Sequence, residues 1–232
     1  AADPEGRALP PERYGIKCIS VGMLVGEDAP TIWRGPIASR LLQQFLGAVH
    51  WGELDYLLLD LPPGTGDVQL TLCQSAPLSG AVIVTTPQAV ALRIAKKGLK
   101  MFQQVNVPIL GIIENMAGDV FGRGGGEQIA RELAVPFLGS VPLDQAMVEA
   151  GDAGTPLVIY RPEAEGAKAF QAIARRMAAQ LSIAHIREQD VTDKPVEVKL
   201  VDHTPPTIHW SDGRVMKYNI KELRLASGSA EN

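Results

Sequence analysis

Short apolar runs alternate with amphipathic stretches along most of the chain. The apolar runs that have the length and composition of strands cover residues 16–25, 56–61, 81–85, 108–113 and 136–140. Between them, apolar side chains recur every three or four positions and predict helices over residues 36–49, 68–75, 89–104, 126–133 and 168–181. Strands that are apolar along their whole length are typical of a parallel sheet that is covered on both faces. We therefore expect an α/β fold, with a mostly parallel sheet and helices on both of its faces.

The pattern changes after residue 183, where charged residues become more frequent and the helical period stops. Residues 207–210 and 215–218 read as strands that flank Asp212-Gly213. This pair favours a type I′ hairpin turn, because both central residues of such a turn need positive φ. The sequence thus predicts an α/β domain over residues 1–183 and a small β appendage over residues 194–232.

Composition narrows the class of protein. The 232 residues are 46% hydrophobic and 21% charged, which is ordinary for a globular chain. A net charge of −4 gives no electrostatic footprint for nucleic acid, so we expect no nucleic-acid partner. No run approaches the roughly 20 apolar residues that span a bilayer, and the first residues contain no apolar signal region. We expect a cytoplasmic protein with no membrane partner.

Cys18 and Cys73 are isolated; a disulfide is possible in principle, but we expect reduced core residues.

Ligands of a parallel sheet bind at the carboxyl ends of its strands, which directs attention to Asp60, Thr85 and Asn115. Asp60 ends an apolar run, where a carboxylate needs a cation or strong donors. In phosphate-binding ATPases an aspartate at such a position holds Mg²⁺, although Asp also serves as a helix cap or turn residue. The next residues, 62–67, combine two prolines with glycines whose N–H groups can face an anion, as a γ-phosphate sensor requires.

The string Asp-Leu-Pro-Pro-Gly-Thr-Gly-Asp at 60–67 resembles the signature of the Mrp/ApbC family. These proteins are iron–sulfur cluster carrier ATPases related to MinD and to the nitrogenase iron protein. Further matches occur in the family's order, over about residues 10 to 180: Tyr14-Gly-Ile-Lys17, Trp33-Arg-Gly-Pro36, Thr85-Thr-Pro-Gln88, Ile113-Glu-Asn-Met116, Phe121-Gly-Arg-Gly-Gly-Gly-Glu127 and Val141-Pro-Leu-Asp144. The resemblance implies a P-loop NTPase fold with ATP and Mg²⁺ as cofactors.

The resemblance also implies roles for single residues. Asp60 would be the catalytic, Mg²⁺-linked aspartate, and Gly64 and Thr65 would belong to the loop that contacts the γ-phosphate. The side-chain amide of Asn115 would hydrogen-bond the purine ring, since it supplies both a donor and an acceptor; without the neighbouring motifs we would interpret Asn115 as a turn residue. Pro142 and Asp144 would line the base pocket.

Two other segments resemble binding motifs but are interpreted otherwise. Residues 124–126 are three glycines without the lysine of a phosphate-binding loop, and the resemblance makes them a structural loop. Arg93, Lys96, Lys97 and Lys100 are interpreted as a solvated helix face.

The chain departs from the family in two places. It contains no G-x-x-x-x-G-K-[ST] loop, so we expect a P-loop NTPase fold that is incomplete at the N-terminus and does not hydrolyse ATP by itself. A fragment, absent upstream residues and a degenerate relative are the open explanations. The interval 117–120 also lacks the family's C-x-x-C, so no metal ligands are predicted there, and a cluster held by other ligands or a different cargo remains open.

The appendage carries a weaker resemblance. Thr207-Ile-His-Trp-Ser-Asp-Gly-Arg-Val, followed by Tyr218 and Leu223-Arg-Leu225, is similar to the N-terminal domain of γ-butyrobetaine hydroxylases. That domain binds zinc through cysteines after the Leu-Arg pair, and residues 226–230 contain none, so we expect no zinc.

Two functional hypotheses follow. In the first, the intact protein is a homodimeric ATPase that carries an iron–sulfur cluster to apoproteins or cluster-assembly proteins. In the second, it is a degenerate, non-catalytic scaffold that acts through protein–protein contacts.

Overall fold

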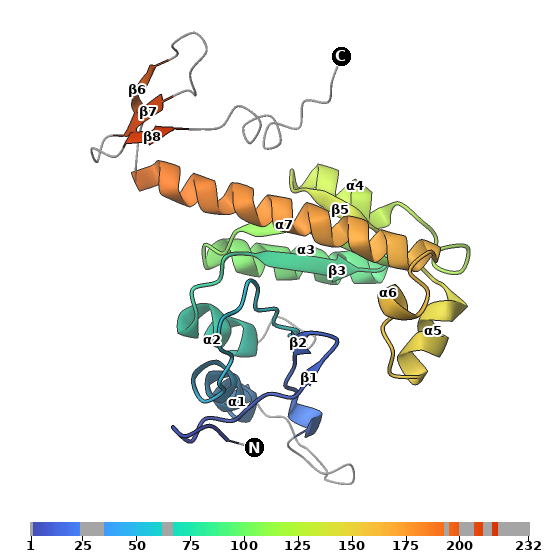
Figure 1. The fold of residues 1–232 in the computed structure, drawn as a ribbon. Coiled ribbons are helices and arrows are strands. Elements are labelled where there is room, and N and C mark those ends of the chain that lie inside the picture. Colours follow the sequence, from blue (N-terminus) through green and yellow to red (C-terminus); the bar gives the residue numbers. More distant parts are fainter. Residues whose placement is uncertain are drawn as a thin grey trace. The chain divides into compact units, whose positions relative to one another are not determined.

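The computed structural model describes residues 2–23, 35–61, 67–192, 195–199, 207–210 and 215–217, and it divides into two compact units, Ala1–Ala178 and Ala179–Asn232 (Figure 1). The elements of the first unit are, in chain order, β1 (Glu12–Arg13), β2 (Ile16–Lys17), the 3₁₀ helix η1 (Val21–Met23), α1 (Gly35–Gly47), α2 (Asp67–Ser75), β3 (Ala81–Thr85), α3 (Ala89–Gln104), β4 (Ile109–Ala117), α4 (Gly125–Glu132), β5 (Phe137–Pro142), α5 (Gln145–Asp152) and α6 (Leu157–Tyr160). Helix α7 (Glu165–Thr192) begins in the first unit and ends in the second, where β6 (Pro195–Lys199), β7 (Thr207–Trp210) and β8 (Val215–Lys217) follow.

The centre of the first unit is a parallel sheet with the strand order β3-β4-β5. Neighbouring residues of a strand point to opposite faces, so Ile112 packs with α3 and α4 while Ile113 packs with Ile173 of α7. The α3/α4 side holds the larger buried cluster: Ile83, Ala95, Leu99, Met101, Phe102, Val107, Ile112, Ile129 and Ala130. Helices therefore cover both faces of a parallel sheet, which confirms the predicted α/β class (Figure 1).

Two predicted strands are wrong. Residues 56–61 form no ladder with any described residue, and Tyr56 and Leu58 are 56% and 74% exposed. In the run 16–25, the structure describes residues 16–23, and of these only Ile16–Lys17 is a strand; it pairs with β1, and residues 21–23 form the 3₁₀ helix η1. An apolar run indicates that a segment favours burial. A strand also needs a neighbouring backbone to pair with, and that neighbour cannot be predicted from the run itself.

The two cysteines differ from their predicted burial. Cys18 is exposed, which corrects its prediction as a core residue. It follows β2, which is held at the surface by antiparallel pairing with β1 rather than inside the sheet. Cys73 on α2 is half-buried against the α3/α4 core, and this burial raises the pKa of its thiol.

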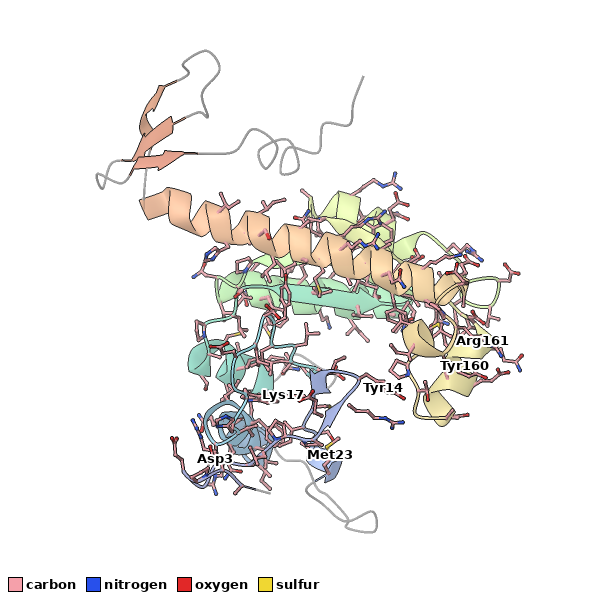
Figure 2. The ribbon with its side chains drawn as sticks, viewed as in Figure 1. Asp3, Tyr14, Lys17, Met23, Tyr160 and Arg161 are labelled. Carbon is pink, nitrogen blue, oxygen red and sulfur yellow. The ribbon has the colours of Figure 1, made fainter. Side chains whose placement is uncertain are left out.

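The segments before β3 are held together by polar contacts. The Ser39 hydroxyl on α1 donates to Thr71 Oγ1 on α2 at 3.1 Å. Lys17 Nζ donates to the carbonyl of Trp51 at 2.6 Å, so β2 is tied to the chain that follows α1. Figure 2 shows Tyr14 at the turn of the β1–β2 hairpin, on the side of α5 and α6; its hydrogen bond with the Thr155 side chain lowers the pKa of the phenol.

The second unit contains an antiparallel sheet with the order β6-β7-β8. Ile208 pairs with Met216 and His209 with Val215, as the predicted hairpin requires. The turn residues Asp212 and Gly213 lie outside the described residues, and the division into domains over residues 1–183 and 194–232 stays a prediction.

None of the helices that the structure describes has both the length and the apolar content needed to cross a bilayer.

A cluster near the N-terminus predicts an acid-dependent part of the stability. Burial of the Asp3 carboxyl raises its pKa, but hydrogen bonds from the Arg7 side chain and backbone and from His50, together with the charge of Arg7, outweigh it and lower the pKa from 3.8 to about 2. Arg7 Nε and His50 Nδ1 each lie 2.8 Å from Asp3 Oδ2. Because the folded-state pKa is depressed, this contribution is complete above 3.8 and is lost as the pH falls through about 2.

We expect Asp3→Asn to reduce the acid sensitivity of the fold. The midpoint of thermal unfolding, followed by circular dichroism, should fall less between pH 5 and pH 2 in the variant than in the unchanged chain, because the variant has no carboxylate to protonate. Asp119→Asn, at an exposed position in the loop after β4, is the matched control and should keep the full pH dependence. Equal pH dependence in Asp3→Asn and the unchanged chain would contradict the prediction.

Candidate functional site

The carboxyl ends of the three parallel strands meet at one edge of the sheet. Thr85 ends β3 and is paired in register with Glu114 of β4, while Ala117 at the end of β4 is paired with Pro142 at the end of β5. The backbone N–H of Leu143 also donates to the carbonyl of Ala117 at 3.0 Å. This edge is where ligands of open α/β sheets bind.

Asn115 lies in a β-bulge at this edge. Glu114 pairs with Ser140 and Ala117 with Pro142, so Asn115 and Met116 oppose a single residue of β5. Met116 has a φ of 57°, an uncommon value for a residue with a side chain. The side-chain oxygen Oδ1 of Asn115 accepts from the Met116 N–H at 2.9 Å. One lone pair of Asn115 Oδ1 and its amide group have no partner among the described residues, which leaves an acceptor and a donor for a ligand.

The residues after the bulge form a short closed loop. Gly118 N–H donates to Gly122 O at 2.9 Å, and Gly122 N–H donates to Gly118 O at 2.7 Å. Val120, in the interval where the family carries its C-x-x-C, is 74% exposed. Among the described residues, no group of three or more His, Cys, Asp and Glu side chains is placed to hold a metal ion.

Glu114 is a fully buried carboxylate that the sequence analysis did not single out as a site residue. Its side chain is 0% exposed. Oε1 accepts from the Gly124 N–H at 2.9 Å and from the Ser140 hydroxyl at 3.3 Å, and Oε2 accepts from the Gly126 N–H at 2.7 Å. A charged residue inside an apolar strand was the available signal, because burying a carboxylate requires strong donors.

The glycine triplet that Glu114 holds is closely packed. A Cβ at Gly125 would lie 2.7 Å from the Pro87 carbonyl, and a Cβ at Gly126 would lie 2.9 Å from the Glu114 Cβ. Gly124 has a φ of 86°, which side chains rarely adopt. Gly124 is the N-cap of α4, and Gly125 and Gly126 are its first residues, so the triplet forms the start of the helix and not a loop before it. It fixes this helix to the ends of β3 and β4, which is a structural role.

Of the predicted site residues in the segment 60–65, the structure describes Asp60 but not Gly64 or Thr65. Asp60 is exposed at the end of residues 56–61, next to Leu61, which packs against the α3/α4 core. It makes no hydrogen bond or ion pair with the residues that the structure describes, and Gly64 and Thr65 lie outside them. The structure thus brings Asn115 and Pro142 to one edge, whereas no contact relates Asp60 to them.

Asp144 has a local structural role. Its Oδ1 accepts from the Ala146 N–H at 2.8 Å, which makes it the N-cap of α5. Its place in a base pocket stays a prediction, which rests on the position of Asp144 two residues after Pro142 at the end of β5.

Comparisons with known proteins place this chain in a family. The family model described as ParA, NUBPL iron-transfer P-loop NTPase, matches residues 1–178. The iron–sulfur cluster carrier protein of Synechocystis sp. is 52% identical over 193 residues, which are 78% of this chain and 55% of that protein. The protein of the same name from Escherichia coli K12 is 47% identical over 189 residues, 77% of this chain and 51% of that protein. The chain spans about half the length of the curated relatives it matches.

Solved structures agree on the fold. A nucleotide-binding protein from Archaeoglobus fulgidus in complex with ADP is 35% identical with a TM-score of 0.57, over 72% of this chain and 67% of that one. The septum site-determining protein MinD of Pyrococcus horikoshii, complexed with Mg-ADP, is 25% identical with a TM-score of 0.52, over 65% of this chain and 59% of that one. The predicted P-loop NTPase fold class is therefore confirmed, and the chain belongs to the ParA family of NUBPL-type iron-transfer P-loop NTPases.

Proposed function

We propose that the complete protein binds ATP with Mg²⁺ and uses it to carry an iron–sulfur cluster to apoproteins. The observation that carries this proposal is the bulge that presents Asn115 at the carboxyl edge of the sheet, in a chain that belongs to an iron-transfer family. The names of the relatives support the cargo, and the ADP in the Archaeoglobus fulgidus structure supports the nucleotide.

Each residue at the edge suits one part of a nucleotide. The amide of Asn115 offers a donor and an acceptor to the purine, and Pro142 offers an apolar surface beside it. The exposed carboxylate of Asp60 suits Mg²⁺, which proteins hold through one or two carboxylates and water. When bound, Mg²⁺ would neutralise charge on the phosphates. We assign the γ-phosphate contact to Gly64 and Thr65 on the resemblance alone.

The cargo and its recipients are proposals of the same kind. We propose a homodimer in the cytoplasm that passes its cluster to apoproteins or assembly proteins, without nucleic acid or membrane. Cys18 is exposed and Cys73 half-buried, and each is a single thiol. To hold an iron–sulfur cluster, either thiolate would need further cluster ligands from a second copy of the chain or from outside the described residues.

Calorimetry on the complete gene product tests the proposal. Titration with ATP should give binding that strengthens when Mg²⁺ is present, and Asn115→Ala should weaken it about tenfold, since a donor–acceptor pair to the base is lost. Gln128→Ala, on the exposed side of α4, is a control that should leave binding unchanged. Absence of Mg²⁺-dependent ATP binding would reject the proposal and favour the non-catalytic scaffold.

A cluster-transfer assay tests the second half of the proposal. The complete protein is reconstituted with iron and sulfide and mixed with an apo-ferredoxin, and the ferredoxin signal is followed by circular dichroism. Transfer above the rate given by iron and sulfide alone is expected. A rate equal to that background would leave a nucleotide-binding protein with no carrier role.

A further inference from the structure

Strand β4 carries a buried charge that the proposed function does not use. Glu114 lies next to Asn115, and its side chain is 0% exposed. Removing a carboxylate from water is costly unless hydrogen bonds replace the water, so a buried carboxylate that is kept needs donors. Its partners are the N–H groups of Gly124 and Gly126 and the Ser140 hydroxyl.

These partners lie on different elements. Gly124 and Gly126 are at the start of α4, and Ser140 is on β5. Glu114 itself pairs with Thr85 of β3 on one side and with Ser140 of β5 on the other. The Glu114 side chain thus joins β4 to β5 and to the start of α4 directly before the bulge, while its backbone pairs with β3. On the far side of the bulge, the Leu143 N–H holds the Ala117 carbonyl.

The bulge is the part of this edge that needs support. Met116 keeps a φ of 57°, and a residue with a side chain holds such a value only where its surroundings fix it. The conformation also sets the direction of Asn115, because an extra residue in a strand re-aims the side chains beside it. Hydrogen bonds hold the chain on both sides of the bulge, at the Glu114 side chain and at the Ala117 carbonyl.

We propose that Glu114 is a positioning residue for base selectivity: its carboxylate clamps the start of α4, at Gly124 and Gly126, and Ser140 to β4, and this clamp holds the bulge that directs Asn115 toward the purine. This inference rests on the proposed function, because it assumes that a base binds at Asn115.

The clamp requires a carboxylate rather than an amide. Both oxygens of Glu114 accept, Oε1 from Gly124 and Ser140 and Oε2 from Gly126. In Glu114→Gln one oxygen becomes an NH₂ group, which can only donate, so it faces a backbone N–H with another donor. The variant keeps the size of the side chain and loses one side of the clamp.

Glu114→Gln in the complete gene product tests the proposal. The dissociation constant for Mg·ATP should rise about tenfold, and the ratio of the GTP to the ATP dissociation constant should fall toward one. Turnover at saturating ATP should stay within about twofold, because the phosphates are held elsewhere. Glu127→Gln, the same substitution at an exposed position of α4, should change none of these values.

A second variant acts on the clamp without changing either Glu114 or Asn115. Gly126→Ala places a Cβ 2.9 Å from the Glu114 Cβ and should produce the same loss of selectivity. If Glu114→Gln does not fold, Gly126→Ala and Ser140→Ala decide the question, Ser140→Ala with a smaller effect because its 3.3 Å bond is the longest of the three. Amide hydrogen exchange at Gly124 and Gly126 in the 232-residue chain should be faster in each variant.

The outcomes separate this inference from the proposed function. If Asn115→Ala weakens ATP binding and Glu114→Gln leaves the affinity and the GTP to ATP ratio unchanged, the positioning role is overturned and the proposed function stands. If Asn115→Ala has no effect on ATP binding, base recognition at this edge fails and the inference fails with it. Selectivity lost in Glu114→Gln and Gly126→Ala but kept in Glu127→Gln supports the positioning role.

Discussion

Replacing Leu99 with alanine is expected to lower the free energy of unfolding by about 2–5 kcal/mol. Leu99 on α3 is 1% exposed and belongs to the cluster that fills the space between the sheet and α3/α4. The substitution removes buried methyl groups and leaves a cavity, and both effects cost free energy because packed interiors relax only in part. Urea denaturation followed by circular dichroism measures the change.

The neighbouring residue provides a control with the opposite sign. Gly98 lies inside α3, and nothing lies within 4 Å of a Cβ built on it. Gly98→Ala should therefore raise the free energy of unfolding by about 0.5–1 kcal/mol, because alanine loses less backbone entropy in a helix. A loss below about 1 kcal/mol for Leu99→Ala would show that Leu99 does not belong to the core of the sheet.

The elements around this core were predictable from local pattern. The predicted bounds of β3 and α3, residues 81–85 and 89–104, are those of the structure. Leu99 and Phe102 are three residues apart and buried, and Lys97 and Lys100 are three residues apart and exposed. This spacing is that of a helix with one buried face. Periods of two and of about 3.6 residues are properties of the chain itself, so they can be found without knowing its partners.

The remaining elements depend on contacts that are distant in sequence. Leu58 is 74% exposed although its neighbours are apolar, because residues 56–61 pair with no described strand. Ile16 is 64% exposed for a related reason: its partner is Arg13 in a short hairpin, and not a strand of the central sheet. Apolar content predicts that a segment favours burial, but the pairing of backbones decides whether it becomes a strand.

The sequence contained signals for two features of the site that the predictions did not use. Asp144 was predicted to line a base pocket, and the structure also shows it as the N-cap of α5, a helix that was not predicted. Aspartate before a run with Ala146 and Ala150 on one face is a helix-start signal. Glu114 is harder to find, because two of its partners are backbone N–H groups, which a search for pairs of residue types does not detect.

Replacing Asp60 with alanine is expected to lower the Mg²⁺-dependent ATP turnover of the complete gene product by about 100-fold or more. The physical reason is electrostatic: a carboxylate beside the phosphates would hold the cation whose charge offsets theirs, and alanine cannot. Turnover is measured as phosphate release at saturating ATP with and without Mg²⁺. Asp60 is exposed and makes no hydrogen bond or ion pair with the described residues, so the variant removes no polar contact among them.

A measurement of stability beside turnover makes the experiment decisive. Neighbouring Leu61 packs against the α3/α4 core and is unchanged in the variant, so the midpoint of thermal unfolding should stay within error of the unchanged protein. Asp55→Ala is the matched control, since Asp55 is exposed in the same segment, and it should keep both the stability and the turnover. Lost turnover with an unchanged midpoint places the effect in the chemistry and not in the fold. Unchanged turnover in Asp60→Ala would remove Asp60 from the proposed Mg²⁺ site, whatever the motif at 60–67 resembles.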